Sequence, residues 1–541
     1  MKTSKILLAA IFASIASFGG YAQSAFDAYS VSQPDLRGTA RYMSMAGAFG
    51  ALGGDLSVLN QNPGGIGIYR SSEVGLTLDW NIQKSNTESE AMQYSAKNTN
   101  FNFNNIGYVG TFRTNFDATP NFNWGFTYNK VASFNRHYVG QINRIATSMT
   151  NYVAGQTNAG GWTASDLGAV AGSNGYNPYQ ESNAPWMSIL AYNSYLINPN
   201  GTGDHFSGLY QNGTTGYGEF EVDERGHINE YSISFGGNAY DKVYWGATIG
   251  ITDMDYRLYS YYGESLNNAN VPYVDKDGNE KTGAGNASWG MENDFRMKGT
   301  GVNFKAGVIV KPINELRIGV AFHTPTYYSL KSEYSANTSY SFISDVASAS
   351  NINGDAYTDE GYVGETWFES RSPWKFIGSV AGVIGGRGIL SFDYERNMYP
   401  SMRISYDGKE DMQVTSSIKQ YYQSSNIFRI GGEFKVTPQF SVRAGYSYQT
   451  SPFKSEIKNN ELDVVTAGTT LAYTLDDNIQ YLTAGLGYRY KAFYADFAFV
   501  HKDRKSEYHA FSPESTALNN APQATVKDSN NEIVFSFGFK F

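Results

Sequence analysis

Side chains that alternate between apolar and polar with a period of two recur along this chain, and this feature most limits how it can fold. Near the carboxyl end, Phe535, Phe537, Phe539 and Phe541 share one face of an extended segment, and Ser, Gly and Lys occupy the other. This alternation is typical of a β-strand whose two faces meet different surroundings. The pattern returns in IFRIGGEFKV, QFSVRAGYSYQ, YLTAGLGYRY, GVNFKAGVIVK and ELRIGVAFH. We therefore predict an all-β chain.

The composition decides how such strands could enter a membrane. The chain has 541 residues, of which 15% are aromatic and 17% charged, and it has no cysteine. Past the amino terminus it contains no apolar run of about eighteen residues, the length that a spanning helix needs. Only helices and closed barrels satisfy every backbone hydrogen bond in lipid, so a membrane form must be a barrel. The net charge of −9 argues against nucleic acid as a partner.

The amino terminus resembles an export signal. Lys2 and Lys5 precede an apolar run from 6 to 18, and a small-x-small cleavage site follows at 20–22. This arrangement predicts a secretory signal peptide over 1–22. A short membrane anchor is the alternative. An exported chain without cysteine has no disulfide or thiolate metal site.

The lengths of the connections distinguish a membrane barrel from a secreted soluble β protein, which is the alternative. Short and long connections alternate strictly along the chain, as they do in outer-membrane barrels with periplasmic turns and extracellular loops. We predict a transmembrane antiparallel β-barrel of about fourteen strands over 71–541, in the bacterial outer membrane. The predicted strands are 71–83, 104–116, 121–134, 228–240, 242–255, 298–311, 315–328, 373–385, 388–400, 424–436, 438–449, 480–490, 492–504 and 531–541. The predicted long loops are 84–103, 135–227, 256–297, 329–372, 401–423, 450–479 and 505–530.

A chain that forms an outer-membrane barrel should interact with membrane lipid and with the machinery that assembles such barrels. The alternating phenylalanines would face outer-membrane lipid and lipopolysaccharide. Phe541 would also be the terminal aromatic residue by which the barrel-assembly machinery recognises its clients.

Residues 23–70 lack alternation and are rich in Gly and small residues, so they predict a small helical hatch. The helices should break at Gly53-Gly54 and at Pro63, with Asp55 as a helix cap. Fourteen strands enclose a lumen wider than side chains alone can fill, so we expect this segment to lie inside the barrel.

The run GTARYMSMAGAFGALGGDLSVLNQNPGGIGIYR resembles the hatch of the FadL/TodX family of outer-membrane transporters, and RIGVAFHTPTYYSL resembles a strand of that family. The family motif Asn-Pro-Ala is Asn62-Pro63-Gly64 here. The resemblance implies a fourteen-stranded barrel and passive transport of long-chain fatty acids or other hydrophobic compounds by a laterally opening monomer. Asn62, Pro63, Gly64 and Gly65 would then form a gating switch in the hatch. Without the resemblance, the same residues would be a tight turn that leads into the first strand.

Hydrophobic cargo needs apolar surfaces outside and along the lumen. The long 135–227 connection supplies aromatic residues: Trp162, Tyr176, Tyr179, Trp186, Tyr192, Tyr195 and Phe206. Charged lumen residues could meet a carboxylate head group, although such charges also line barrels of any function. The candidate substrate-binding residues are Arg317, His323, Tyr327, Tyr328, Arg429 and Arg443.

The sequence gives little support for a metal site, a cofactor or catalysis. The six histidines show no paired ligand spacing, so we expect neither a metal nor any other cofactor. His323 could act as a base in an outer-membrane hydrolase, but a simple hydrogen-bonding role is favoured and we do not expect an enzyme. The Asp277-Gly278 and Asp407-Gly408 pairs predict hairpin turns. A surface receptor or adhesin that binds ligands through its long loops is the alternative function.

Overall fold

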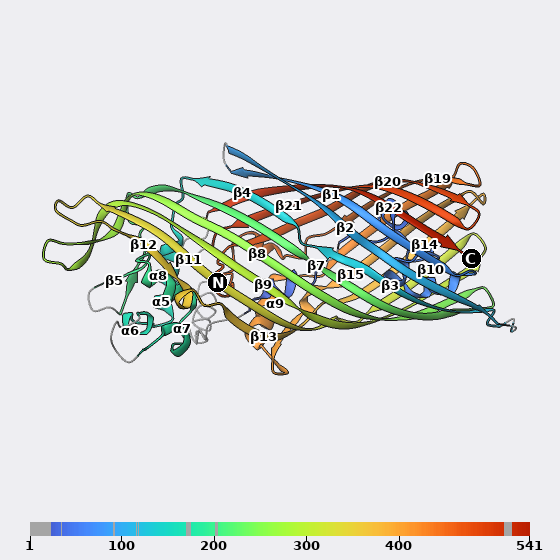
Figure 1. Cartoon of the computed structure of the whole chain (residues 1–541), viewed down its shortest axis with the longest axis horizontal. Coiled ribbons are helices and arrows are strands. Elements are labelled where there is room, and N and C mark those ends of the chain that lie inside the picture. The colour runs from blue at the N-terminus through green and yellow to red at the C-terminus, as the bar shows by residue number, and fades with distance from the viewer. Residues whose placement is uncertain are drawn as a thin grey trace, which may run out of the picture.

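The computed structural model describes residues 23–33, 35–89, 92–114, 116, 118–168, 175–200, 204–512 and 522–541. The predicted signal peptide, 1–22, lies outside these ranges. Within them, fourteen antiparallel strands form a closed barrel, as predicted (Figure 1). The wall strands are β1 (Glu73–Ser89), β2 (Met92–Arg113), β3 (Asn121–Ser133), β7 (Thr215–Ala239), β8 (Val243–Val274), β9 (Glu280–Ile313), β10 (Leu316–His323), β14 (Trp374–Ile384), β15 (Gly388–Met398), β18 (Ser425–Lys435), β19 (Phe440–Gln449), β20 (Tyr473–Tyr490), β21 (Phe493–His509) and β22 (Gln523–Lys540).

The barrel closes where the last strand pairs with the first. Val74 of β1 lies opposite Phe539 of β22, and the ladder continues to Glu88 opposite Thr525. Phe535, Phe537, Phe539 and Phe541 are all exposed on the outer face, as predicted. Each strand therefore presents an apolar outer row to the membrane and a polar inner row to the lumen.

The connections are short at one end of the barrel and long at the other, as predicted. The carboxyl end of the chain lies at the short-turn end (Figure 1). Three predicted long loops were wrong. Residues 84–89 and 92–103 continue β1 and β2, and residues 256–297 continue β8 and β9 to a turn at 275–279. Most of 329–372 forms further strands, which pair with β9 and with one another. These segments remain paired because they extend the ladders beyond the membrane.

Both predicted hairpin turns form, at Asp407-Gly408 as a two-residue turn and at Asp277-Gly278 within the longer turn 275–279. The chain reverses at Asp277-Gly278 between β8 and β9, and at Asp407-Gly408 between β16 and β17. Gly278, Asp407 and Gly408 all have positive φ, which these turns require. The smaller strands are β4 (Arg136–Asn143), β5 (Asn198–Pro199), β6 (Phe206–Ser207), β11 (Tyr327–Ser344), β12 (Ile352–Tyr357), β13 (Gly364–Arg371), β16 (Arg403–Tyr406) and β17 (Lys409–Glu410).

The prediction of one continuous strand over 315–328 was wrong, because two separate strands occupy this stretch. β10 ends at His323, and β11 begins at Tyr327. Pro325 cannot donate a hydrogen bond to the ladder, and Pro373 interrupts the facing strand in the same way. The wall of the barrel is therefore discontinuous at 324–326.

The segment before β1 folds into short helices inside the barrel. These are α2 (Ala25–Ser30), α3 (Ala40–Ser44), α4 (Val58–Gln61) and the 3-10 helix η1 (Pro63–Ile68). The predicted cap Asp55 was wrong, because Ser57 precedes α4 and the Asp55 carboxylate instead accepts hydrogen bonds from the Thr39 hydroxyl and the Ser57 amide. Among the described helices, none has the length and apolar character to cross a membrane.

A cap covers the long-loop end. Its helices lie beside the long β8–β9 and β11–β12 strands (Figure 1). Trp186 joins cap and wall, with its ring 4.9 Å from that of Tyr334 and 5.1 Å from that of Tyr179. The helices of the loops are α5 (Met149–Ala159), α6 (Ala164–Leu167), α7 (Pro178–Glu181), α8 (Trp186–Asn193), η2 (Thr358–Gly361), η3 (Tyr399–Ser401), α9 (Met412–Tyr421) and α10 (Ser455–Lys458).

Candidate functional site

The predicted gating residues lie where the hatch meets the barrel wall. The Asn62 side chain donates to the Gly50 carbonyl at 2.6 Å and accepts from the Gly64 amide at 3.0 Å. A Cβ on Gly64 would lie 2.9 Å from the carbonyl oxygen of Gly307 on β9. Asn62, Pro63, Gly64 and Gly65 are all buried. This part of the hatch is held tightly against the wall.

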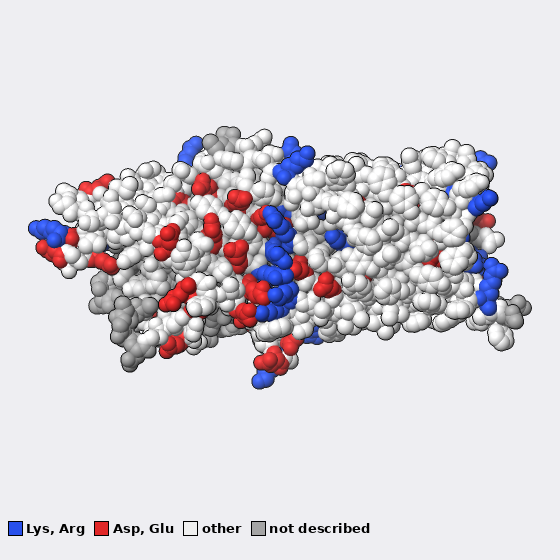
Figure 2. All heavy atoms as spheres, in the orientation of Figure 1, with Lys and Arg blue, Asp and Glu red and all other residues white. Residues whose placement is uncertain are grey.

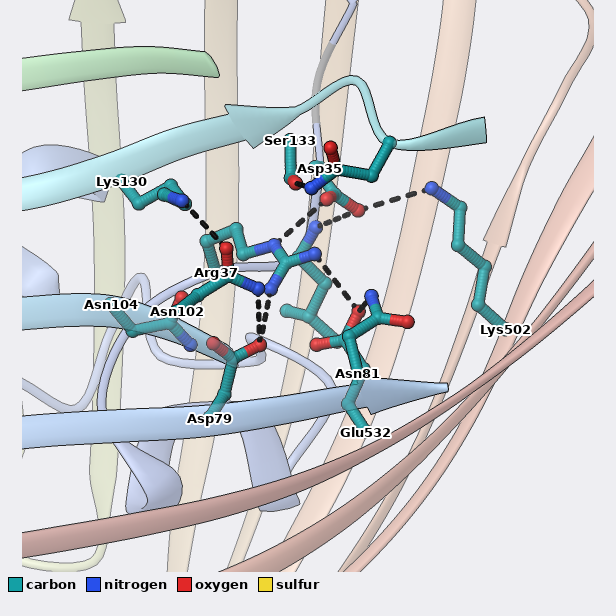
Figure 3. Close-up of polar contacts among 12 residues, drawn as sticks. Asp35, Arg37, Asp79, Asn81, Asn102, Asn104, Lys130, Ser133, Lys502 and Glu532 are labelled. Carbon is teal, nitrogen blue, oxygen red and sulfur yellow. Dashed lines mark hydrogen bonds and ion pairs between the residues drawn. The ribbon is translucent and has the colours of Figure 1, made fainter. Parts of the chain in front are cut away.

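A buried ion-pair network ties the preceding hatch segment to the opposite side of the wall (Figure 3). The three guanidinium nitrogens of Arg37 each meet a different carboxylate. The partners are Asp35 at 2.9 Å, Asp79 of β1 at 2.6 Å and Glu532 of β22 at 3.0 Å. Lys502 of β21 adds a contact to Asp35 at 3.1 Å.

Two cations act on the Asp35 carboxylate of this network. Burial alone would raise the pKa of the Asp35 carboxyl, but Lys502 and Arg37 outweigh it and hold that pKa well below its usual range. Only 2% of the Arg37 side chain is exposed, so loss of one partner would leave an uncompensated buried charge. The network therefore fixes where the hatch sits.

A second set of ion pairs holds helix α3. The Arg41 guanidinium contacts Glu433 of β18 at 2.9 Å. Arg443 of β19 bridges Glu433 and Asp496 of β21, at 2.6 Å each. A continuous chain of ion pairs therefore connects α3 of the hatch to three strands of the wall.

An apolar chamber lies above α2, towards the long loops, with a cavity volume of about 120 Å³. The hatch contributes Phe26 and Tyr29, and the wall contributes rings from strands that are distant in sequence. The Phe26 ring lies 5.3 Å from that of Tyr473. The other aromatic residues that line the chamber are Tyr138, Tyr256, Phe295, Tyr334 and Tyr508.

A polar chamber with a cavity volume of about 150 Å³ lies on the other side of the same hatch segment. Gln33 lines both chambers, so the segment 24–33 separates them. Lys305 of this chamber is paired with Glu230, and Arg429 with Glu395 at 2.8 Å. The chamber also reaches the break in the wall, where its lining residues are Thr324, Thr326 and Ser372.

The structure separates the six candidate substrate-binding residues. His323, Tyr328 and Arg429 line the polar chamber. Arg317 donates to the Leu52 carbonyl of the hatch at 2.7 Å, and Arg443 belongs to the ion pairs beneath α3. Tyr327 points outward and is 52% exposed.

Sequence reasoning missed the wall residues of the apolar chamber. Tyr256 and Phe295 fall in a stretch that was predicted to be a loop. Met254, Tyr256 and Met297 are buried between half-buried or exposed neighbours, but polar residues on both faces of this stretch hide the strand pattern in the sequence.

The surroundings of His323 are those of a structural residue. Its Nε2 lies 2.8 Å from the Gln61 carbonyl of the hatch, with no carboxylate within hydrogen-bonding distance among the described residues. No group of three or more His, Cys, Asp or Glu side chains that could hold a metal occurs in the described part of the chain.

A closed barrel with an apolar outer surface and a bore filled by its own amino-terminal segment defines an outer-membrane transport barrel. Residues 241–540, more than half of the chain, match the model of the family "Outer membrane protein transport protein (OMPP1/FadL/TodX)". The chain belongs to this family. The predicted family, barrel fold, outer-membrane location and transport role are confirmed.

One solved structure shows the same fold, and another is similar at a lower score. A Pseudomonas aeruginosa FadL homologue is similar at 11% identity and a TM-score of 0.51, over 94% of this chain and 100% of that one. The Pseudomonas putida toluene transporter TodX has 13% identity and a TM-score of 0.44, over 94% of this chain and 99% of that one. No curated protein matches the sequence.

Proposed function

We propose that the chain passes hydrophobic small molecules passively across the outer membrane, by way of the apolar chamber. The observation that carries this proposal is the ring-lined cavity directly above the hatch. Burial of apolar cargo there would contribute about 25 cal/mol per Å² of apolar surface removed from water. Membership of the FadL/TodX family of outer-membrane transport proteins adds support for hydrophobic cargo.

The segment 24–33 is the barrier that cargo must displace. It is the only hatch segment that borders the apolar chamber among the described residues, and it also borders the polar chamber. Residues 62–65 would serve as the fixed base of the hatch, because their backbone is packed against β8 and β9. The units of this device are the hatch, 23–70, and the barrel, 71–541.

The polar chamber offers a contact for an acidic head group. Lys375 lines it and has no ion-pair partner among the residues that the structure describes. Lys305 and Arg429, in contrast, are each paired with a glutamate. A carboxylate that entered beside the aromatic path could therefore pair with Lys375.

The break in the wall is the proposed exit into the membrane. Side-chain hydroxyls replace part of the ladder there. The Phe304 amide donates to the Thr324 hydroxyl at 3.0 Å, and the Thr326 amide donates to the Ser372 hydroxyl at 2.8 Å. Such hydroxyl-mediated bonds can be exchanged with little cost to the rest of the barrel.

A disulfide across the break tests this route. Because the chain has no cysteine, Thr326→Cys with Ser372→Cys introduces a single pair. Uptake of a labelled long-chain fatty acid by cells should fall on oxidation and recover on reduction. Thr300→Cys with Ser329→Cys is the matched control, because these residues face each other on the intact β9–β11 ladder. Unchanged uptake through the locked break would contradict the proposed exit.

A further inference from the structure

The outer surface of the barrel changes from apolar to charged along its strands. On β7, the outward Phe235, Ile233 and Tyr231 are exposed and apolar, and the next charged residues on that face are Arg225 and Asp223. Figure 2 shows the result as a band of Lys and Arg at one edge of the uncharged surface, with acidic residues beyond it. The band lies towards the long loops.

The strand register places like charges side by side. Arg225 of β7 lies opposite Arg257 of β8, and Arg257 lies opposite Arg296 of β9. Lys298 of β9 lies opposite Lys331 of β11. We call these five residues the cationic belt. Like charges directly opposite each other destabilise a sheet, so this arrangement needs a compensating anion.

Carboxylates of the chain supply only part of that compensation. Arg257 and Arg296 share one carboxylate, that of Asp255, and the Arg257 contacts are long, at 3.3 and 3.4 Å. Lys298 and Lys331 share Glu333, and Lys331 also contacts Glu365 at 2.6 Å. The Arg225 and Arg257 side chains remain 68% and 59% exposed. Both guanidinium groups therefore reach solvent or lipid head groups on the outer face, although Arg225 also pairs with Asp223 and Arg257 with Asp255.

The level of the belt matches that of lipid head groups. The exposed apolar row of β8 runs from Val243 to Ile251, which spans about 27 Å along the strand and somewhat less across a tilted wall. An apolar band of about 25 Å is typical of outer-membrane barrels. The next outward residues of β8 are Asp253 and Asp255, followed by Arg257. The belt therefore borders the outer leaflet.

We propose that the cationic belt binds the phosphate groups of a phosphorylated glycolipid in the outer leaflet of the membrane. Guanidinium groups bind phosphate oxygens through paired N–H donors, and a row of three arginines suits a head group with more than one phosphate. Trp367 extends the belt as an aromatic neighbour, with the Lys331 ammonium 5.9 Å from its ring centre. The bound lipid would hold the long β7–β11 strands at a fixed height in the membrane.

Native mass spectrometry of the full chain in detergent, titrated with diphosphorylated lipid A, tests the proposal. The triple variant Arg225→Gln, Arg257→Gln, Arg296→Gln should bind this probe about tenfold or more weakly than the wild type. A matched triple, Arg387→Gln, Lys435→Gln, Lys491→Gln, removes three exposed cations at the short-turn end and should bind like the wild type.

A second arm needs no variant, so it remains decisive if the triple variant fails to fold. The wild type should bind dephosphorylated lipid A, and phosphatidylglycerol, about tenfold more weakly than diphosphorylated lipid A. Equal binding of the dephosphorylated lipid would overturn a phosphate contact. Equal binding of phosphatidylglycerol would reduce the belt to a general anion surface and overturn the glycolipid assignment. Equal binding by a folded triple variant would overturn the site.

Discussion

Arg37 shows how a single side chain can set the position of the hatch. Its three carboxylate partners come from the hatch itself and from both sides of the barrel seam. Buried pairs of this kind add little net stability, but removal of one partner is costly. Arg37 therefore specifies one seated arrangement of the hatch.

Arg37→Met should weaken the docking of the hatch against the barrel wall. It leaves Asp35, Asp79 and Glu532 without their shared partner, and we expect a loss of about 3–5 kcal/mol in the stability of the docked segment. Hydrogen exchange of the amides at 35–44 measures this change. Lys527→Met removes an exposed pair with Glu88 and should cost about 0–1 kcal/mol. If these amides exchange as slowly in Arg37→Met as in the wild type, Arg37 does not hold the hatch in place.

Asp27 makes the docking of α2 depend on pH. Its carboxylate accepts from the Ser24 amide at 2.6 Å at the edge of the apolar chamber, which Glu224 and Asp294 also line. Burial raises the pKa of Asp27 from 3.8 to about 6. The docked helix thus binds this proton more tightly than the undocked one. The resulting stability is full below pH 3.8 and is lost as the pH rises through about 6.

Asp27→Asn should remove this dependence because the amide stays neutral. At pH 8 the variant should protect the amides of 25–30 about tenfold better than the wild type, and at pH 4 the two should be alike. Hydrogen exchange at both pH values measures the effect. An equal effect of the substitution at pH 4 and pH 8 would show that Asp27 does not titrate in this range.

Among the elements, η1 depends most on close packing of backbones. Gly64→Ala places a methyl group 2.9 Å from the Gly307 carbonyl oxygen and 3.0 Å from the Val308 Cα, both of which are backbone atoms of β9. Such overpacking costs about 1–3 kcal/mol and should loosen the base of the hatch. Cells that carry this variant should therefore admit a labelled polar solute that the wild type excludes.

Gly378→Ala is the control for this experiment. Gly378 lies on β14 with no atom within 4 Å of an added Cβ, so the substitution should leave the barrier intact. If Gly64→Ala and Gly378→Ala leak equally little, close approach of η1 to the wall is not what seals the bore.

The strand ends near the short turns could be predicted because Pro, Gly and Asp mark them, and because lipid imposes a strong apolar contrast there. That contrast disappears above the membrane, where both faces of β8 and β9 carry polar residues. The pattern of 256–297 therefore resembled a loop. The break after His323 was missed because apolar residues continue on both sides of Pro325.

The chambers and ion pairs could not be predicted from sequence, because they depend on contacts between distant segments. Phe26 meets Tyr473, and Arg37 meets Glu532, only after the barrel has closed around the hatch. Arg317 and Arg443 were candidates for cargo because they face the lumen. The sequence could not show that the hatch or neighbouring carboxylates already occupy them.

At the scale of the whole molecule, the wall, the hatch and the two chambers act together in transport. The wall keeps the chain in the membrane, and the hatch divides the bore into an apolar and a polar chamber. We expect this filled bore to exclude polar solutes. Selection of hydrophobic cargo then depends on rings that the wall and the hatch supply together.

The most direct test of this account compares two solutes in cells with and without the protein. A labelled long-chain fatty acid and a labelled polar solute of similar size are added, and uptake of each is followed. The account predicts faster uptake of the fatty acid when the protein is present, and no change for the polar solute. Faster entry of the polar solute with unchanged fatty-acid uptake would contradict it and would indicate an ordinary open porin.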